Sequence, residues 1–199
     1  MKINSSSSWG MRTPLRSFSP HVPFSIVIHH VGAGEQPNIP IWKRNGTRVI
    51  ESIERHHIDF KGWNAIGYHY IILPDGNIYE GRPDNVIGAH VGNNNTGRIG
   101  ILVYGNFTYE HPTDEQKQAL NELILHLKQK YTIDNKDVFY HGELVNTMCC
   151  GKNLAIYVSQ KRLINWKAEE DQKVNTLVRR SMVMKLIDEL KDAIKELTS

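Results

Sequence analysis

Cysteine is scarce in this sequence: the 199 residues contain two cysteines, Cys149 and Cys150, and they are adjacent. Consecutive Cα atoms lie about 3.8 Å apart, whereas unstrained disulfides join Cα atoms roughly 4.4–6.8 Å apart. A disulfide between these neighbours is therefore a poor expectation, and the count argues against a scaffold held together by disulfides. The two side chains are either buried free thiols or a source of thiolate for a metal ion, and a metal ion needs further ligands elsewhere in the chain.

Long apolar runs and a strong excess of one charge are also missing. No apolar run approaches the roughly 18–20 residues of a membrane-spanning helix, and residues 1–14 lack the apolar core of a secretory signal peptide. The formal net charge of +3 permits an anionic polymer as partner but is far below that of a typical nucleic-acid-binding protein. We therefore expect neither a membrane span nor a nucleic acid partner.

Strand and helix signals alternate along the chain, as in proteins in which helices flank a β-sheet. Apolar, β-branched stretches predict strands at residues 24–30, 66–73, 97–107 and 138–141, with 66–81 forming a hairpin. Amphipathic periodicity predicts helices at residues 48–60, 113–130 and 159–168. Thr113 and Gln116 have the spacing of a capping box, which predicts the start of the second helix.

The two ends of the chain differ from this middle part. Residues 1–22 are expected to be irregular, residues 23–169 to form the main domain, and residues 170–199 to form an amphipathic helical tail. Apolar residues recur in the tail at heptad-like spacing, at Val183, Ile187, Leu190, Ile194 and Leu197. This stripe suits a helix docked on its own domain as well as self-association of two copies.

A pair of histidines ends the first predicted strand. His29 and His30 follow an apolar run, and polar groups at the carboxyl end of a strand often face a site. Successive side chains of a strand point to opposite faces, so one of the two histidines can face a given site. The same reasoning suggests that one of Cys149 and Cys150 does so. Several of the other eight histidines, among them His57 on the first predicted helix, are expected to be ordinary solvated or core residues.

His141 lies eight residues before Cys149. Three protein ligands with one open position are a recurrent design of catalytic zinc sites, and neutral imidazole and thiolate are suitable donors for Zn²⁺. Ligands so far apart in the sequence are not a compact zinc-finger signature. The residues alone therefore leave a His-His-Cys zinc site and buried structural thiols about equally well supported.

Several stretches match a known family in order along the chain. They are WGMRTP (9–14), IVIHHVG (26–32), GWNAIGYHYIILPDGNIYEGRP (62–83), GAH (88–90) followed by Asn95, and HGELVNTMCCGKNL (141–154). Together they resemble the zinc-dependent N-acetylmuramoyl-L-alanine amidases of the type-2 class, which include phage endolysins, bacterial wall amidases and peptidoglycan recognition proteins. The resemblance implies an α/β fold with a mixed central β-sheet, flanking helices and a zinc groove, and it offers no counterpart for the tail.

The resemblance also implies the metal ligands. By position, His29, His141 and Cys149 match the three residues that hold zinc in the family. Cys150 stands where the family usually has proline, so the choice of Cys149 rests on its spacing from His141 and on the following Gly151. The implied cofactor is Zn²⁺.

Five further residues are expected near the metal. Tyr68 matches the catalytic tyrosine of the family, and its protonated phenol, with an ordinary pKa of about 10, suits hydrogen-bond donation to an oxyanion. Thr147 is expected either to donate to the same oxyanion or to cap a turn. His90 and Asn95 match groove-wall positions and are expected to bind substrate, although Asn95 could simply shape its loop. Arg82 is expected to bind a stem-peptide carboxylate or to pin the hairpin.

The activity implied by the resemblance is zinc-dependent hydrolysis of the amide between N-acetylmuramic acid and the L-alanine of peptidoglycan stem peptides. The alternative is a non-catalytic protein that recognises peptidoglycan, but such members typically lack the ligand cysteine. The absence of a stapling cysteine pair favours a phage endolysin or bacterial wall enzyme, with cell wall degradation and antimicrobial action as expected roles. The expected localisation is cytoplasmic accumulation with action at the cell wall, or secretion if a signal has been removed.

Overall fold

The structure, a computed structural model, describes residues 1–32, 46–163, 166, 183–185 and 187. Contacts divide the chain into residues 1–163, which contain all the strands found among the described residues, and residues 164–199. The predicted tail over 170–199 falls largely outside the described residues, so the hypothesis of a heptad-like helix stays a prediction.

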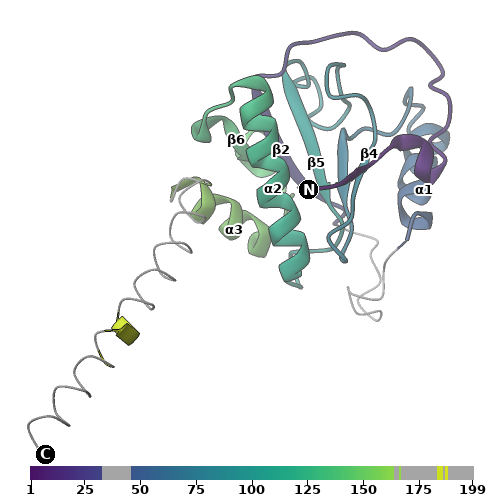
Figure 1. The fold of residues 1–199 in the computed structure, drawn as a ribbon. Coiled ribbons are helices and arrows are strands. Elements are labelled where there is room, and N and C mark those ends of the chain that lie inside the picture. Colours follow the sequence, from purple (N-terminus) through teal and green to yellow (C-terminus); the bar gives the residue numbers. More distant parts are fainter. Residues whose placement is uncertain (33–45, 164–165, 167–182, 186, 188–199) are drawn as a thin grey trace, which may run out of the picture. The chain divides into compact units, whose positions relative to one another are not determined.

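A six-stranded mixed sheet organises residues 1–163 (Figure 1). Its strands, in the spatial order β1-β4-β3-β5-β2-β6, are β1 (Ile3–Asn4), β2 (Ser25–His30), β3 (Tyr70–Ile72), β4 (Ile78–Glu80), β5 (Arg98–Val103) and β6 (Val138–Tyr140). Strands β3, β5, β2 and β6 are parallel, whereas β4 returns antiparallel to β3. The mixed α/β sheet and the hairpin expected from the sequence are confirmed.

Among residues 46–163, three α-helices lie between or after these strands. They are α1 (Arg48–Arg55), which continues as one π-helical turn over His56–Phe60, α2 (Asp114–Tyr131) and α3 (Lys152–Leu163). Helix α3 starts at Lys152 and not at residue 159 as predicted, because it begins directly after Gly151, whose φ of +78° ends the preceding loop. Among the described residues, no helix is both long and apolar enough to cross a membrane.

One face of the sheet is covered by α1 and Trp9. Ile50 of α1 belongs to the same buried cluster as Ile71 of β3 and Leu102 of β5. Leu102 is opposite His29 in the parallel pairing of β5 with β2, and paired residues of neighbouring strands point to the same face. His29 therefore projects from the face that α1 covers.

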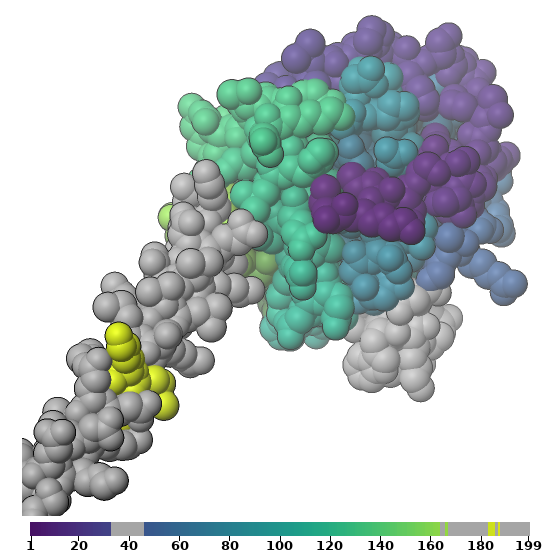
Figure 2. Space-filling model, viewed as in Figure 1, coloured from purple at the N-terminus to yellow at the C-terminus, as the bar shows by residue number. Residues whose placement is uncertain are grey.

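The N-terminal segment belongs to the fold and is less irregular than predicted. Ile3 pairs with Ile78 where β1 lies parallel to β4, and Trp9, which is 3% exposed, donates a hydrogen bond from Nε1 to the Glu80 carbonyl at 2.7 Å. Figure 2 shows the N-terminal end of the chain, in dark purple, beside α2. A two-residue strand has no periodicity to detect, which is why the sequence pattern missed it.

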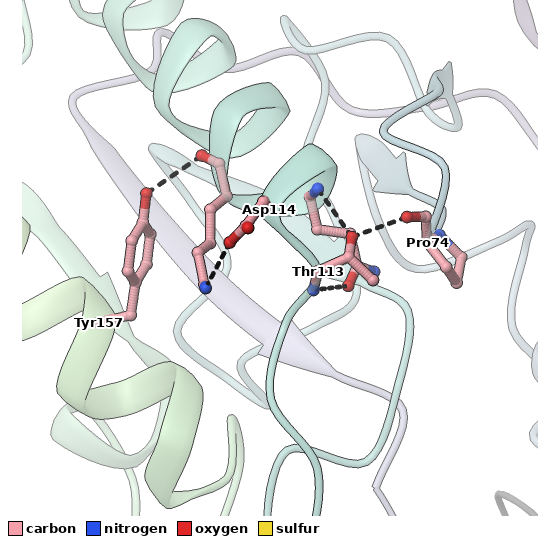
Figure 3. A network of polar contacts seen from close by, with 6 residues as sticks. Pro74, Thr113, Asp114 and Tyr157 are labelled. Carbon is pink, nitrogen blue, oxygen red and sulfur yellow. Dashed lines mark hydrogen bonds and ion pairs between the residues drawn. The ribbon is translucent and has the colours of Figure 1, made fainter. Parts of the chain in front are cut away.

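The start of α2 is fixed by the predicted capping box (Figure 3). Thr113 Oγ1 accepts a hydrogen bond from the Gln116 backbone N–H at 3.0 Å, and Gln116 Oε1 accepts one from the Thr113 N–H at 3.1 Å. The Thr113 hydroxyl also donates to the Pro74 carbonyl at 2.7 Å, which ties α2 to the hairpin turn. Nearby, the Tyr157 hydroxyl of α3 donates to the Lys117 carbonyl at 3.1 Å and links the two helices.

Replacing Thr113 with valine is expected to lower the free energy of unfolding by about 1–2 kcal/mol. Valine keeps the shape of threonine but can neither accept the hydrogen bond from Gln116 nor donate to Pro74. Urea denaturation with an unchanged m value would measure the loss. Thr13→Val, at an exposed position, is the matched control and should change stability by less than about 0.5 kcal/mol; equal losses in both variants would contradict the role of the cap.

Candidate metal centre

Two neighbouring strands bring a histidine each to the same edge of the sheet. In the parallel pairing of β2 with β6, Ile28 lies opposite Tyr140, so the next residues, His29 and His141, lie side by side. Their ring centroids are 4.4 Å apart. His29 is buried within β2, whereas His141 is half-buried and begins the short turn that follows β6. Two imidazoles that are 112 positions apart in the chain thus meet because of strand register.

The sulfur of Cys149 completes a group of three metal-binding side chains. Cys149 Sγ lies 3.8 Å from His29 Nδ1, and one ligand atom from each of His29, His141 and Cys149 lies within 4.8 Å of the others. The Gly142 N–H donates to the Cys149 carbonyl at 2.6 Å, and the His30 N–H donates to Cys149 Sγ at 3.4 Å. Two imidazoles and one sulfur are a donor set that suits zinc with an open coordination position.

Burial controls the protonation of these three groups. Burial, with smaller contributions from neighbouring histidines, holds the pKa of His29 well below its ordinary value, and burial also lowers the pKa of His141. Neutral imidazoles have a lone pair to offer to a metal. Burial raises the pKa of the Cys149 thiol to about 11, so a bound cation would have to displace the thiol proton. The site is therefore suited to a divalent cation that favours thiolate.

The second member of each pair points away from this group. His30 Nδ1 accepts a hydrogen bond from the Phe107 N–H at 3.1 Å. Cys150 is 1% exposed, and burial raises the pKa of its thiol well above the ordinary value. Side chains alternate between the two faces of the strand, so His29 and His30 point in opposite directions. The loop places the Cys149 side chain beside His29, whereas the Cys150 side chain packs in the core.

Tyr68 lies beside the three metal-binding side chains. Its ring centroid is 5.3 Å from that of His29, with the two planes tilted by 55°. Burial, and then the nearby sulfur of Cys149, raises the pKa of the phenol above its ordinary value. The phenol therefore stays protonated around neutral pH and can donate a hydrogen bond at this position.

His57, which we expected from the sequence to be an ordinary core or solvated residue, holds the backbone next to Tyr68. His57 is buried, and its Nδ1 accepts a hydrogen bond from the Gly67 N–H at 3.1 Å. The ring of His57 also stacks on Trp63, with centroids 4.6 Å apart. A Cβ atom at Gly67 would lie 2.3 Å from the Ala89 carbonyl oxygen, so glycine is required there. No local pattern in the sequence signals this support.

Arg82 turns inward and pins the hairpin, which is the structural alternative raised from the sequence. Its guanidinium donates to the backbone carbonyls of Ile66 at 2.5 Å, Ile87 at 2.9 Å and Ala65 at 3.3 Å. The side chain is buried, and burial lowers the pKa of the guanidinium to about 10. Because the guanidinium nitrogens already donate to backbone carbonyls, this geometry does not support the expected contact between Arg82 and a substrate carboxylate.

His90 and Asn95 are also engaged within the protein. Asn95 Oδ1 accepts hydrogen bonds from the backbone N–H groups of His90 at 2.7 Å and Val91 at 2.8 Å, so Asn95 shapes its loop. His90 Nδ1 lies 3.0 Å from His29 Nε2, and the ring is buried. The expectation that His90 lines the wall of an open groove does not agree with this placement, because the ring lies behind His29.

The loop between His141 and Cys149 is held at two points. Thr147 is exposed, and its Oγ1 accepts a hydrogen bond from the Cys149 N–H at 3.3 Å, as in a turn cap. Glu143 forms a two-pronged ion pair with Arg162 of α3, at 2.5 Å and 3.1 Å. The ion pair fixes the start of the loop against α3, and the cap orients the backbone at Cys149.

The sequence is similar to proteins of one family. Residues 19–153 match the family described as N-acetylmuramoyl-L-alanine amidase. Peptidoglycan-recognition protein SC2 of Drosophila melanogaster is 33% identical over 169 residues, which are 83% of this chain and 88% of that protein. An N-acetylmuramoyl-L-alanine amidase of Sus scrofa is 33% identical over 107 residues, which are 53% of this chain and 18% of that much longer protein.

Solved structures share the fold. The N-acetylmuramoyl-L-alanine amidase LysC from Clostridium intestinale matches with a TM-score of 0.62 and 33% identity, over 77% of this chain and 91% of that one. Drosophila PGRP-LB matches with a TM-score of 0.70 and 30% identity, over 79% and 92%. Peptidoglycan recognition protein-LE, solved with tracheal cytotoxin, matches with a TM-score of 0.71 and 28% identity, over 79% and 92%. Amidases and recognition proteins thus both occur among the similar structures.

Proposed function

Because this chain belongs to the N-acetylmuramoyl-L-alanine amidase family, we propose that it is a zinc-dependent hydrolase of peptidoglycan. The bond cut is the amide between N-acetylmuramic acid and the L-alanine that begins the stem peptide. The observation that carries the proposal is the meeting of His29, His141 and Cys149, with their ligand atoms within 4.8 Å of one another. These three residues would hold the zinc ion.

A zinc ion bound by three protein ligands supplies a water molecule of lowered pKa and polarises a carbonyl oxygen. The neutral rings of His29 and His141 would provide lone pairs, and the Cys149 sulfur, in hydrogen-bond contact with the His30 N–H, would provide negative charge once the bound ion displaces the thiol proton. Tyr68 keeps its proton because burial raises the pKa of its phenol. It therefore donates a hydrogen bond to the substrate oxygen on which negative charge develops.

Thr147 supplies a second hydroxyl at the exposed side of the site. Its oxygen accepts from the Cys149 N–H at 3.3 Å, which leaves the hydroxyl proton free to donate to the same substrate oxygen. In this role Thr147 supports Tyr68, while His90, Asn95 and Arg82 act through the protein scaffold and not by touching substrate.

A protein that binds peptidoglycan without cutting it is the second candidate. Several relatives are named recognition proteins, and the structure of protein-LE contains tracheal cytotoxin, a monomeric diaminopimelic-acid-type peptidoglycan. Recognition alone does not require two imidazoles and a sulfur whose ligand atoms lie within 4.8 Å of one another. The cluster of His29, His141 and Cys149 therefore favours hydrolysis.

Incubation of the zinc-loaded chain with purified peptidoglycan tests the proposal. We expect new L-alanine amino termini and soluble stem peptides to appear, to stop after chelation, and to return when zinc is added back. If the chain cosediments with insoluble peptidoglycan but produces no new amino termini, the protein binds peptidoglycan without hydrolysing it, and the proposed hydrolysis is wrong. Cleavage that continues at full rate after exhaustive removal of metal would overturn the role of zinc.

A further inference from the structure

We propose that His90 is a positioning residue that selects the tautomer of His29 and thereby aims the lone pair of His29 Nδ1 at the metal. The proposal rests on the zinc site proposed above and adds a residue behind it. It gives His90 a role different from the substrate contact that the sequence suggested.

The two ring nitrogens of His29 face in different directions. Nδ1 lies 3.8 Å from Cys149 Sγ, on the side of the metal-binding group. Nε2 lies 3.0 Å from His90 Nδ1. A neutral imidazole has one N–H and one lone pair, so this 3.0 Å contact is a hydrogen bond in which one ring donates and the other accepts. The direction of that bond decides which nitrogen of His29 is available to a metal.

The far nitrogen of His90 sets the direction. His90 Nε2 lies 3.2 Å from the Arg98 carbonyl oxygen, and a carbonyl oxygen can only accept. His90 therefore carries its proton on Nε2, and Nδ1 of the neutral ring holds the lone pair. It follows that His29 Nε2–H donates to His90 Nδ1. His29 Nδ1 is left with a lone pair directed toward Cys149.

The surroundings of His90 hold the ring in this orientation. The side chain is 6% exposed, and its backbone N–H donates to Asn95 Oδ1 at 2.7 Å. Cβ atoms added at Gly88 or Gly100 would each come within 2.6 Å of the ring, so both glycines make room for it. The ring meets that of His29 nearly edge-on, at 87° and 5.0 Å between centroids. The GAH motif, noted in the sequence as a family match, and Gly100 thus leave the space that this imidazole occupies.

The expected consequence is a contribution to metal affinity. Without the acceptor at His90 Nδ1, His29 can place its proton on Nδ1, and a protonated nitrogen cannot bind zinc. Removing a partner that orients a metal-binding histidine typically weakens metal affinity by about 10–100-fold. The effect on zinc is therefore measurable without any peptidoglycan.

Two variants separate hydrogen bonding from packing. His90→Asn places an amide oxygen near the position of Nδ1 and keeps an acceptor for His29, whereas His90→Leu fills the same space without one. The dissociation constant for zinc is measured by competition with a chromophoric chelator, and the visible spectrum of the cobalt(II)-substituted protein reports the ligand geometry. We expect His90→Leu to weaken zinc binding by about 10–100-fold and His90→Asn to recover most of the loss. His126→Leu, at an exposed position on α2, is the control and should bind zinc as wild type does.

The outcomes distinguish this proposal from the proposed function. A wild-type chain that does not bind zinc would overturn the zinc site itself. Zinc binding of wild-type strength in a folded His90→Leu variant would overturn the role of His90 and leave the zinc site intact. If circular dichroism shows that His90→Leu does not fold, His90→Asn decides: near-wild-type affinity and cobalt spectrum support the role, and a loss of tenfold or more contradicts it.

Discussion

Cys149→Ala is expected to abolish zinc binding and amide cleavage, whereas Cys150→Ala should preserve both. Cys149 Sγ lies 3.8 Å from His29 Nδ1, but Cys150 is buried at 1% exposure in the core. Zinc lowers the pKa of a bound water from 15.7 to about 7, so loss of the ion removes the nucleophile. We expect the cleavage rate to fall by on the order of 10³-fold or more. Cys150→Ala should cost only about 1 kcal/mol of stability.

Zinc per chain, measured by mass spectrometry, and release of alanine amino termini test this pair of variants together. The adjacent cysteines make an internal control, because each variant removes one thiol from the same dipeptide. Circular dichroism shows whether both variants fold. Loss of zinc in Cys150→Ala with full zinc in Cys149→Ala would show that the neighbouring cysteine is the ligand.

Tyr68→Phe is expected to lower kcat by about 10²–10³-fold with zinc content unchanged. Phenylalanine keeps the ring that packs 5.3 Å from His29 but removes the proton that burial keeps on the phenol. A donor that acts on charge developing in the transition state affects kcat more than KM. The loss should therefore appear in kcat, whereas the affinity for zinc should not change.

Steady-state kinetics on a soluble muropeptide and zinc analysis of the same preparation check this prediction. Tyr109→Phe is the matched control, since Tyr109 is 81% exposed and its loss of a hydroxyl should leave kcat as in wild type. Full kcat in Tyr68→Phe would remove the phenol from the mechanism. Loss of zinc in that variant would instead assign the tyrosine to the support of the metal site.

Features that depend on neighbouring residues could be read from the sequence. The apolar run before His29 predicted β2, and the spacing of Thr113 and Gln116 predicted the first turn of α2, where the capping box is present. Alternation along a strand predicted that His29 and His30 face opposite ways, as observed. Periodicity and capping arise from side chains within a few residues of one another, so the sequence displays them directly.

The family resemblance indicated the metal ligands, which local patterns in the sequence could not identify. Spacing alone left the zinc site and buried thiols as equal alternatives, and matched motifs favoured His29, His141 and Cys149. The structure brings the same three side chains together. It does so through the parallel register of β2 with β6, which no local pattern encodes.

Burial and direction of side chains were decided by the tertiary structure. The sequence allowed Arg82 and His90 to face substrate, but Arg82 donates to backbone carbonyls and His90 lies behind His29. The strand β1 was missed because two residues gain their structure only by pairing with β4. The chain by itself determined its local elements and its family. Only packing between distant segments decided which polar side chains lie beside the metal-binding group and which form hydrogen bonds elsewhere within the protein. The reason is that a hydrogen-bond partner far away in the sequence leaves no local pattern.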